Sequence, residues 1–187
     1  VPKVVAMGAV NPVDDPTVED RNALAEYREF HRGEYWTHQW RQLLREHETE
    51  LSDVMDSVLP RKSATNNPSY DAVEACHSYA MFANDEGLMA FPPARTYEAT
   101  AAGAAMVSSD HDCFKERGFV DGENCIMHRR HDIASFRDKV RWYIERPERL
   151  ADVARAGMEM VRMRYSHEQI ARDLYATVEE KYRQCRS

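Results

Sequence analysis

Short apolar runs alternate with longer amphipathic segments along this chain, and polar or proline-containing stretches separate them. Short runs of apolar residues are typical of buried strands, whereas apolar residues three or four positions apart are typical of helices. Alternating strands and helices predict an α/β fold with a doubly wound, mostly parallel, Rossmann-like sheet. The predicted strands are residues 4–7, 56–60, 79–83, 105–108 and 125–128.

Helices are indicated both between these strands and after the last of them. Apolar side chains at helical spacing mark residues 36–51, 136–144 and 150–161. A capping box formed by Ser166 and Gln169 predicts the start of the final helix. We expect this helix to bury the face that carries Ile170, Leu174 and Val178.

The length and composition favour one domain spanning residues 1–187, since 43% of the residues are hydrophobic and can form a core. No apolar run approaches the roughly 20 residues of a membrane-spanning helix, so no transmembrane segment is predicted. The formal net charge of −7 argues against binding to nucleic acid, because affinity for phosphate backbones comes mostly from Lys and Arg. The four cysteines share no CxxC spacing, which favours free thiols in a reducing compartment and a cytoplasmic location.

The most informative segment begins at two prolines and ends at a glycine. Pro92 and Pro93 suit the start of a helix, and Gly103 suits its end. The alanines between them allow the helix backbone to approach a sheet closely. The N–H groups of its first turn can then hold an anion such as a diphosphate. Arg95 and Glu98 lie at the mouth of this helix.

The run Arg95-Thr96-Tyr97-Glu98, followed by small residues up to Gly103, resembles the donor-sugar-binding motif of the GT-B glycosyltransferases, group 1 family. It fits the spore-maturation-protein-like branch. The resemblance covers residues 70–182 and is much weaker over residues 1–69. It continues through residues 116–119, 121–126 and 132–136 and through the late step Tyr165-Ser166-His167.

This resemblance implies a Rossmann-like C-terminal domain that binds a nucleotide-sugar. The family transfers a sugar from that donor to an acceptor, and it usually needs no metal or other cofactor. Its active site lies between two such domains, so the N-terminal acceptor domain is expected to be absent from this chain or supplied by a partner chain. The chain is therefore expected to be the donor-binding half of a glycosyltransferase.

Arg95 and Glu98 are the expected catalytic residues. By the resemblance, Glu98 accepts hydrogen bonds from the ribose of the donor, and Arg95 can pair with its phosphate oxygens. Thr96 and Tyr97 would offer backbone N–H groups to the phosphate, although the Tyr97 ring is equally suited to a core. The simpler alternatives are a helix-dipole partner for Glu98 and a surface ion pair for Arg95.

Four further positions are expected to bind the donor. Gly8 and Asn11 lie in the loop after the first predicted strand, at the edge where open α/β sheets bind ligands. Asn84 follows the strand before the key helix, where a plain turn residue is the alternative. Arg41, within residues 36–51, would supply a cation from a helix.

Two departures from the family pattern favour an alternative function, a glycosyltransferase-like module that binds or assembles without catalysis. Ala90 stands eight positions before Glu98, where many members carry a second glutamate. The loop at residues 11–16 is acidic, where members tend to carry Arg and Lys.

A metal site is the remaining possibility raised by the histidines. A soft-ligand site needs converging side chains at short, fixed spacing, and no zinc signature is present. We therefore predict no metal at His111, Cys113, His128 and His131.

Overall fold

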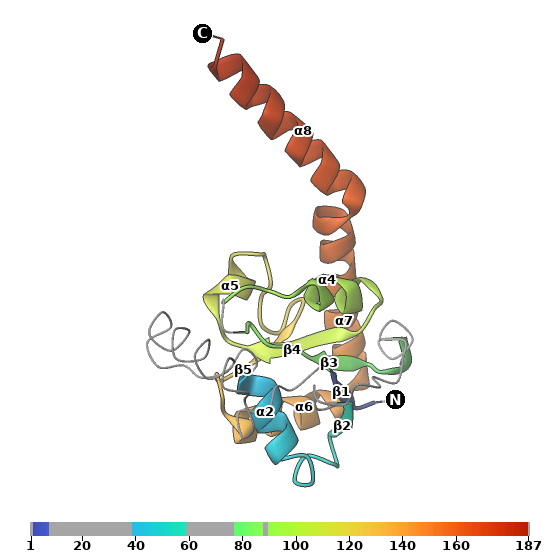
Figure 1. Ribbon diagram of the computed structural model, residues 1–187. Helices are drawn as coiled ribbons and strands as arrows, with labels where there is room; N and C mark the ends of the chain where they lie inside the picture. The colour runs from blue at the N-terminus through green and yellow to red at the C-terminus, as the bar shows by residue number, and fades with distance from the viewer. Residues whose placement is uncertain (1, 8–38, 59–76, 88–89, 187) are drawn as a thin grey trace, which may run out of the picture.

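The computed structural model of this chain describes residues 2–7, 39–58, 77–87 and 90–186, which contain one sheet of five parallel strands (Figure 1). The strands lie in the order β2-β1-β3-β4-β5. Because every neighbouring pair is parallel, each connection crosses back over a face of the sheet. The strands are β1 (Val4–Met7), β2 (Met55–Val58), β3 (Met81–Ala83), β4 (Ala105–Ser109) and β5 (Ile126–His128).

The direction in which strands are added to the sheet reverses next to β1. Val4 in β1 pairs with Met55 of β2 on one side and with Met81 of β3 on the other. The chain adds β2 on one side of β1 and then adds β3, β4 and β5 on the opposite side. In open α/β sheets, ligands bind outside the carboxyl ends of the strands at such a switch point. A ligand site is therefore expected where β1 and β3 end.

Helices cover both faces of this sheet. Figure 1 shows α4 and α5 above the sheet, with α2 and α6 below it. This arrangement confirms the doubly wound parallel sheet predicted from the sequence. The helices are α2 (Gln39–Glu46), α4 (Ala94–Ala101), α5 (Asp112–Lys115), α6 (Ile133–Ile144), α7 (Pro147–Tyr165) and α8 (His167–Gln184).

Two hydrophobic cores lie on the two faces. Side chains alternate between faces along a strand, so Val4 and Ala6 of β1 belong to one core, and Val5 and Met7 to the other. The first core includes buried residues of α2 and α6, and the second includes buried residues of α4 and α5.

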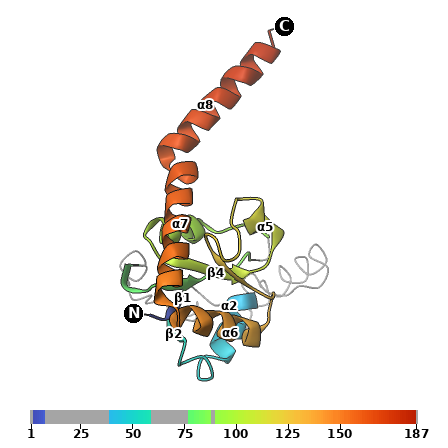
Figure 2. The ribbon, with the colours of Figure 1, turned by 180° about the vertical axis from the view of Figure 1, so that it is seen from behind.

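Helix α7 contributes to both cores. The view from behind in Figure 2 shows α7 running past the sheet from the side of α6 to the side of α4. Its early residues Leu150 and Val153 pack in the first core, and its late residues Met160 and Val161 pack in the second. Between them, a Cβ atom on Gly157 would stand only 2.5 Å from the carbonyl oxygen of Asn124. Glycine therefore allows α7 to pass directly against the backbone that leads into β5.

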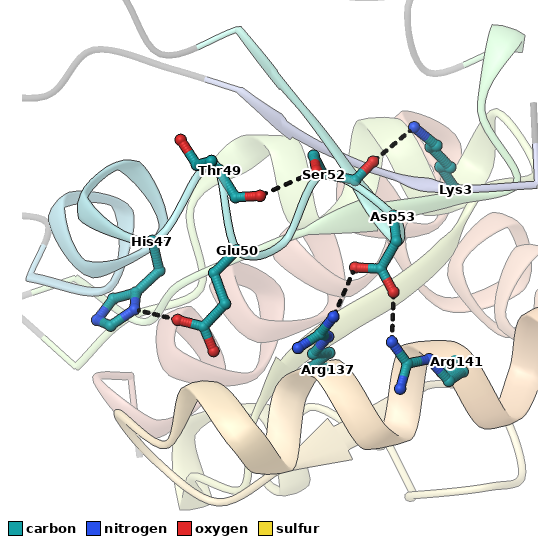
Figure 3. A network of polar contacts seen from close by, with 8 residues as sticks. All are labelled: Lys3, His47, Thr49, Glu50, Ser52, Asp53, Arg137 and Arg141. Atoms are coloured by element: carbon teal, nitrogen blue, oxygen red, sulfur yellow. Dashed lines mark hydrogen bonds and ion pairs between the residues drawn. The ribbon is translucent and has the colours of Figure 1, made fainter.

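Ion pairs join the opposite edge of the sheet, where the strands begin, to α6 (Figure 3). Asp53, which precedes β2, accepts a hydrogen bond from Arg137 at 3.2 Å and a second from Arg141. Lys3, which precedes β1, donates to the Ser52 carbonyl at 2.8 Å. These contacts hold the starts of β1 and β2 together, away from the switch point.

The helix expected at residues 36–51 is shorter at its C-terminal end than predicted. Helix α2 ends at Glu46, and residues 47–54 continue as turns. Leu51 is nevertheless fully buried. It is apolar because the turn packs against the core, and not because the helix continues to this residue. The start of the predicted helix, residues 36–38, lies outside the described residues.

The prediction that the final helix buries its apolar face is wrong for this chain. Ser166 does cap α8, accepting a hydrogen bond from the Gln169 N–H at 3.2 Å. However, Ile170, Leu174 and Val178 are 51%, 63% and 58% exposed, because α8 extends away from the sheet (Figure 1). Among the described residues, no helix is long and apolar enough to cross a membrane.

Candidate functional site

Helix α4 starts at the carboxyl edge of the sheet and has the predicted boundaries. Pro93 is its N-cap residue, and Gly103 has a left-handed φ of +99° just after its end. Ala99 is fully buried in the second core, which brings the helix backbone close to the sheet. The first turn of α4 therefore lies beside the switch point, with Arg95 in it.

Arg95 reaches the end of β1. Its Nη1 atom donates a hydrogen bond to the carbonyl oxygen of Met7, the last residue of that strand, at 2.7 Å. The side chain is half-buried. This contact spans 88 positions in the sequence and fixes a guanidinium group at the switch point.

Asn84 and Thr96 are both buried and form a pair between the end of β3 and α4. The Asn84 Nδ2 atom donates to Thr96 Oγ1 at 2.8 Å, and the Asn84 backbone N–H donates to the Val107 carbonyl, also at 2.8 Å. The Thr96 N–H donates to the Pro93 carbonyl at 2.9 Å, so it is engaged within the turn. The pair thus sets the position of α4 relative to β3.

Tyr97 packs into the second core, the alternative stated above for its ring. Its ring centroid lies 4.6 Å from that of Tyr165 and 6.5 Å from that of Phe119. Burial raises the pKa of the Tyr97 hydroxyl above its ordinary value. Glu98, the next residue, is exposed to solvent one turn into α4.

Two acidic residues that directly follow Asn84 were not singled out from the sequence. Asp85 and Glu86 are only 3% and 4% exposed. Asp85 Oδ1 accepts a hydrogen bond from Arg41 Nη2 at 3.2 Å, which brings Arg41 of α2 to the end of β3. Glu86 accepts hydrogen bonds from Ser109 Oγ and Arg130 Nε, each at 2.6 Å.

The Glu86 carboxylate stays charged despite its burial. Burial alone would raise its pKa, but hydrogen bonds from the Ser109 hydroxyl, the Glu86 backbone and Arg130 hold the pKa below the usual range. A signal for such residues exists in the sequence, since both acids come immediately after a buried strand that borders the switch point.

His128 ends β5 and is buried as a neutral side chain. Burial lowers the pKa of His128 to about 4, despite the carboxylates of Glu86 and Asp132 nearby. Its ring stacks at 4.5 Å on Trp40 of α2, and its Nδ1 atom lies 2.9 Å from the Arg129 carbonyl oxygen. Among the described residues, no group of three His, Cys, Asp or Glu side chains is placed to hold a metal ion.

The remaining predicted positions divide into two groups. Gly8 and Asn11 lie outside the described residues. Ala90 is described, has a left-handed φ of +49° and is exposed in the loop between β3 and α4. Arg95, Asn84, Thr96 and Arg41 therefore gather where β1 and β3 end, and the binding roles expected of them stay predictions.

A family model described as "Glycosyl transferase-like" matches residues 21–176. A comparison with curated proteins gave no match. Among solved structures, sucrose-phosphate synthase from Thermosynechococcus elongatus is similar, with a TM-score of 0.56 and 15% sequence identity. That likeness covers 94% of this chain and 38% of the synthase chain.

Two further structures are similar at 14% identity and a TM-score of 0.53. One is a mutant of S. aureus TarM in complex with fondaparinux, alpha-GlcNAc-glycerol and UDP. The likeness to it covers 94% of this chain and 35% of the TarM chain. The other is the pneumococcal O-GlcNAc transferase GtfA in complex with UDP and GlcNAc, covering 95% of this chain and 35% of that chain. At these identities the likenesses show the fold, and this chain spans little more than a third of each relative.

Proposed function

This chain belongs to the glycosyl transferase-like family, and we propose that it is the donor-binding domain of a GT-B glycosyltransferase. The observation that carries the proposal is the contact between Arg95 and the last carbonyl of β1. It holds a cation at the switch point, where parallel α/β sheets bind their ligands. A nucleotide-sugar carries a diphosphate, which a guanidinium group can bind through paired hydrogen bonds.

In this proposal the exposed Glu98 carboxylate accepts hydrogen bonds from the ribose of the donor. Arg95 and Arg41 offset the charge of the diphosphate as the sugar leaves, so the reaction needs no metal. Asn84 and Thr96 act by holding α4 in place. TarM and GtfA were each solved with UDP, so a UDP-sugar is the first donor to test.

The acceptor side of the proposed active site lies outside this chain. The similar solved proteins are longer, since this chain covers 35–38% of them. We propose that an acceptor-binding domain, in the same polypeptide or in a partner chain, completes the cleft. The absence of CxxC pairs extends the proposal to a cytoplasmic location, where cysteines stay reduced.

The alternative function is a glycosyltransferase-like module without catalysis. The observation that favours it is Ala90, because alanine cannot make the sugar contact that a glutamate makes at this position in many members. Saturable binding of a nucleotide-sugar would argue against this alternative.

The proposal predicts that the chain binds one nucleoside diphosphate selectively among UDP, GDP and ADP. Glu98→Ala should weaken that binding about 10- to 100-fold, because it removes a charged hydrogen-bond partner of the ribose. Isothermal titration calorimetry measures both affinities. Glu159→Ala, at an exposed glutamate of α7, is the matched control and should leave binding unchanged. A folded wild-type chain that binds none of the three would contradict the proposal.

A further inference from the structure

Two consecutive buried acids follow β3, and each holds an arginine from a different part of the fold. Asp85 pairs with Arg41 of α2, and Glu86 pairs with Arg130, which follows β5. Buried charges are costly unless they are paired and hydrogen-bonded. The fold nevertheless keeps both pairs at the carboxyl edge of the sheet, where a ligand is expected to bind. A role for the two arginines in binding that ligand is therefore worth testing.

The geometry around Glu86 joins the ends of three strands. The residue follows β3, its Oε2 atom accepts from Ser109 at the end of β4, and its Oε1 atom accepts from Arg130 beyond β5. The exposed fractions differ sharply, at 4% for the Glu86 side chain and 38% for the Arg130 side chain. A ligand in solvent can therefore reach the arginine but not the acid that orients it.

The backbone beside Arg130 is held in a strained conformation. His131 has a left-handed φ of +55°, which a non-glycine residue rarely adopts. The residue before Arg130 is also held in place, because the Arg129 N–H donates a hydrogen bond to Ser135 Oγ at 3.0 Å. Strained residues of this kind persist where the surrounding contacts fix them, and they gather at ligand sites.

The end of β3 lies beside the end of β1, because Ala83 pairs with Ala6. Arg95 is bonded to the last residue of β1, and Arg130 is bonded to Glu86 just past β3. Arg130 itself follows β5, two strands beyond β3, so Glu86 draws its guanidinium group back toward the part of the carboxyl edge where β3 and β4 end.

From these contacts we propose that Glu86 is a positioning residue that holds Arg130 as a phosphate-binding cation of the donor site. The inference rests on the proposed function. Arg130 adds a positive charge at the carboxyl edge of the sheet, and Glu86 sets the direction of its guanidinium group before the donor arrives. Glu86 itself does not touch the ligand.

The test compares each nucleoside diphosphate with its nucleoside, using UDP and uridine, GDP and guanosine, and ADP and adenosine. Arg130→Gln should weaken diphosphate binding about 10- to 100-fold and leave nucleoside binding within about twofold, because only the phosphate contact is lost. Glu86→Gln should produce a smaller loss with the same phosphate selectivity. Arg141→Ala, at an arginine of the Asp53 ion pair on the opposite edge, is the control and should change neither affinity.

The double variant E86Q/R130Q removes the buried Glu86 charge together with its arginine partner. If Arg130→Gln alone fails to fold, a phosphate-selective loss in the double variant relative to the wild-type chain supports the inference, and an equal loss for diphosphate and nucleoside overturns it. If Glu86 acts through Arg130, the double variant binds diphosphate as weakly as Arg130→Gln alone. Equal losses for diphosphate and nucleoside, or additive losses in the double variant, would overturn the inference.

Failure of the inference is distinguishable from failure of the proposed function. A wild-type chain that binds no nucleoside diphosphate overturns both. A wild-type chain that binds one, with an unchanged diphosphate-to-nucleoside preference in Arg130→Gln, overturns the role of Arg130 and leaves the donor-binding function standing.

Discussion

At the scale of single residues, the carboxyl edge of the sheet concentrates buried groups that titrate. His128 is the clearest case, because burial lowers its pKa to about 4, whereas an unfolded histidine titrates near 6.5. Between these two values the unfolded chain binds more protons than the folded chain. The free energy of unfolding must therefore fall as the pH falls through this window.

We predict that the free energy of unfolding drops by about 2 kcal/mol between pH 7.5 and pH 5.0, from His128 alone. Urea denaturation at the two pH values measures the drop. His128→Gln, which cannot titrate, should be less stable at pH 7.5 and should show a drop smaller by that amount. An equal drop in the variant would mean that His128 is not buried as a neutral group.

The sequence indicated where several residues of the candidate site lie, because a parallel sheet gathers the ends of its strands at one edge. Asn84 follows a strand and Arg95 opens the helix behind it, so both had to lie at the carboxyl edge. Asp85 and Glu86 were missed because acids after a strand are also typical of an exposed turn. Their burial depends on Arg41 and Arg130, which are 44 positions away in each case, and no local pattern shows such pairing.

At the scale of elements, the helix and strand boundaries near α4 followed from local signals. Prolines start the helix and Gly103 ends it, whatever the rest of the chain does. The end of α2 was not predicted correctly. Leu51 lies in a turn but is buried, and its spacing from the apolar residues of α2 is the spacing that a longer helix would give. The sequence also did not predict that α7 packs in both cores, because this position depends on the close contact between Gly157 and the Asn124 carbonyl.

Gly157→Ala tests that close contact. In an open helical position, alanine would stabilise the chain by about 0.5–1 kcal/mol relative to glycine. Here the added methyl group meets the Asn124 carbonyl oxygen at 2.5 Å and Thr100 Cγ2 at 3.1 Å. We therefore predict destabilisation by about 1–3 kcal/mol, measured by urea denaturation. Stabilisation would show that α7 does not pass so close to the start of β5.

At the scale of the whole molecule, the described residues form a sheet domain from which α8 extends. None of the side chains of α8 is buried, although its first turn is capped as the sequence indicated. The apolar stripe of α8 is typical of a helix that packs on something. Sequence periodicity shows that such a face exists, but it does not show what covers it.

A chain that ends at Ser166 should be as stable as the full chain. Because α8 buries none of its own side chains, its removal should change the free energy of unfolding by less than about 0.5 kcal/mol. Urea denaturation of the two chains side by side gives this difference. A loss of more than about 2 kcal/mol would mean that α8 folds back onto the domain in solution.

The place of α7 in the chain has a consequence for synthesis. Residues before 147 supply the sheet, both sets of covering helices and most of each core, yet α7 is needed to complete both faces. A nascent chain emerging from the ribosome would hold two open apolar surfaces until α7 begins to leave the exit tunnel, and the second surface would stay open until Met160 and Val161 follow. One late helix therefore completes this domain, and a chain interrupted before residue 150 would expose apolar surface on two sides at once.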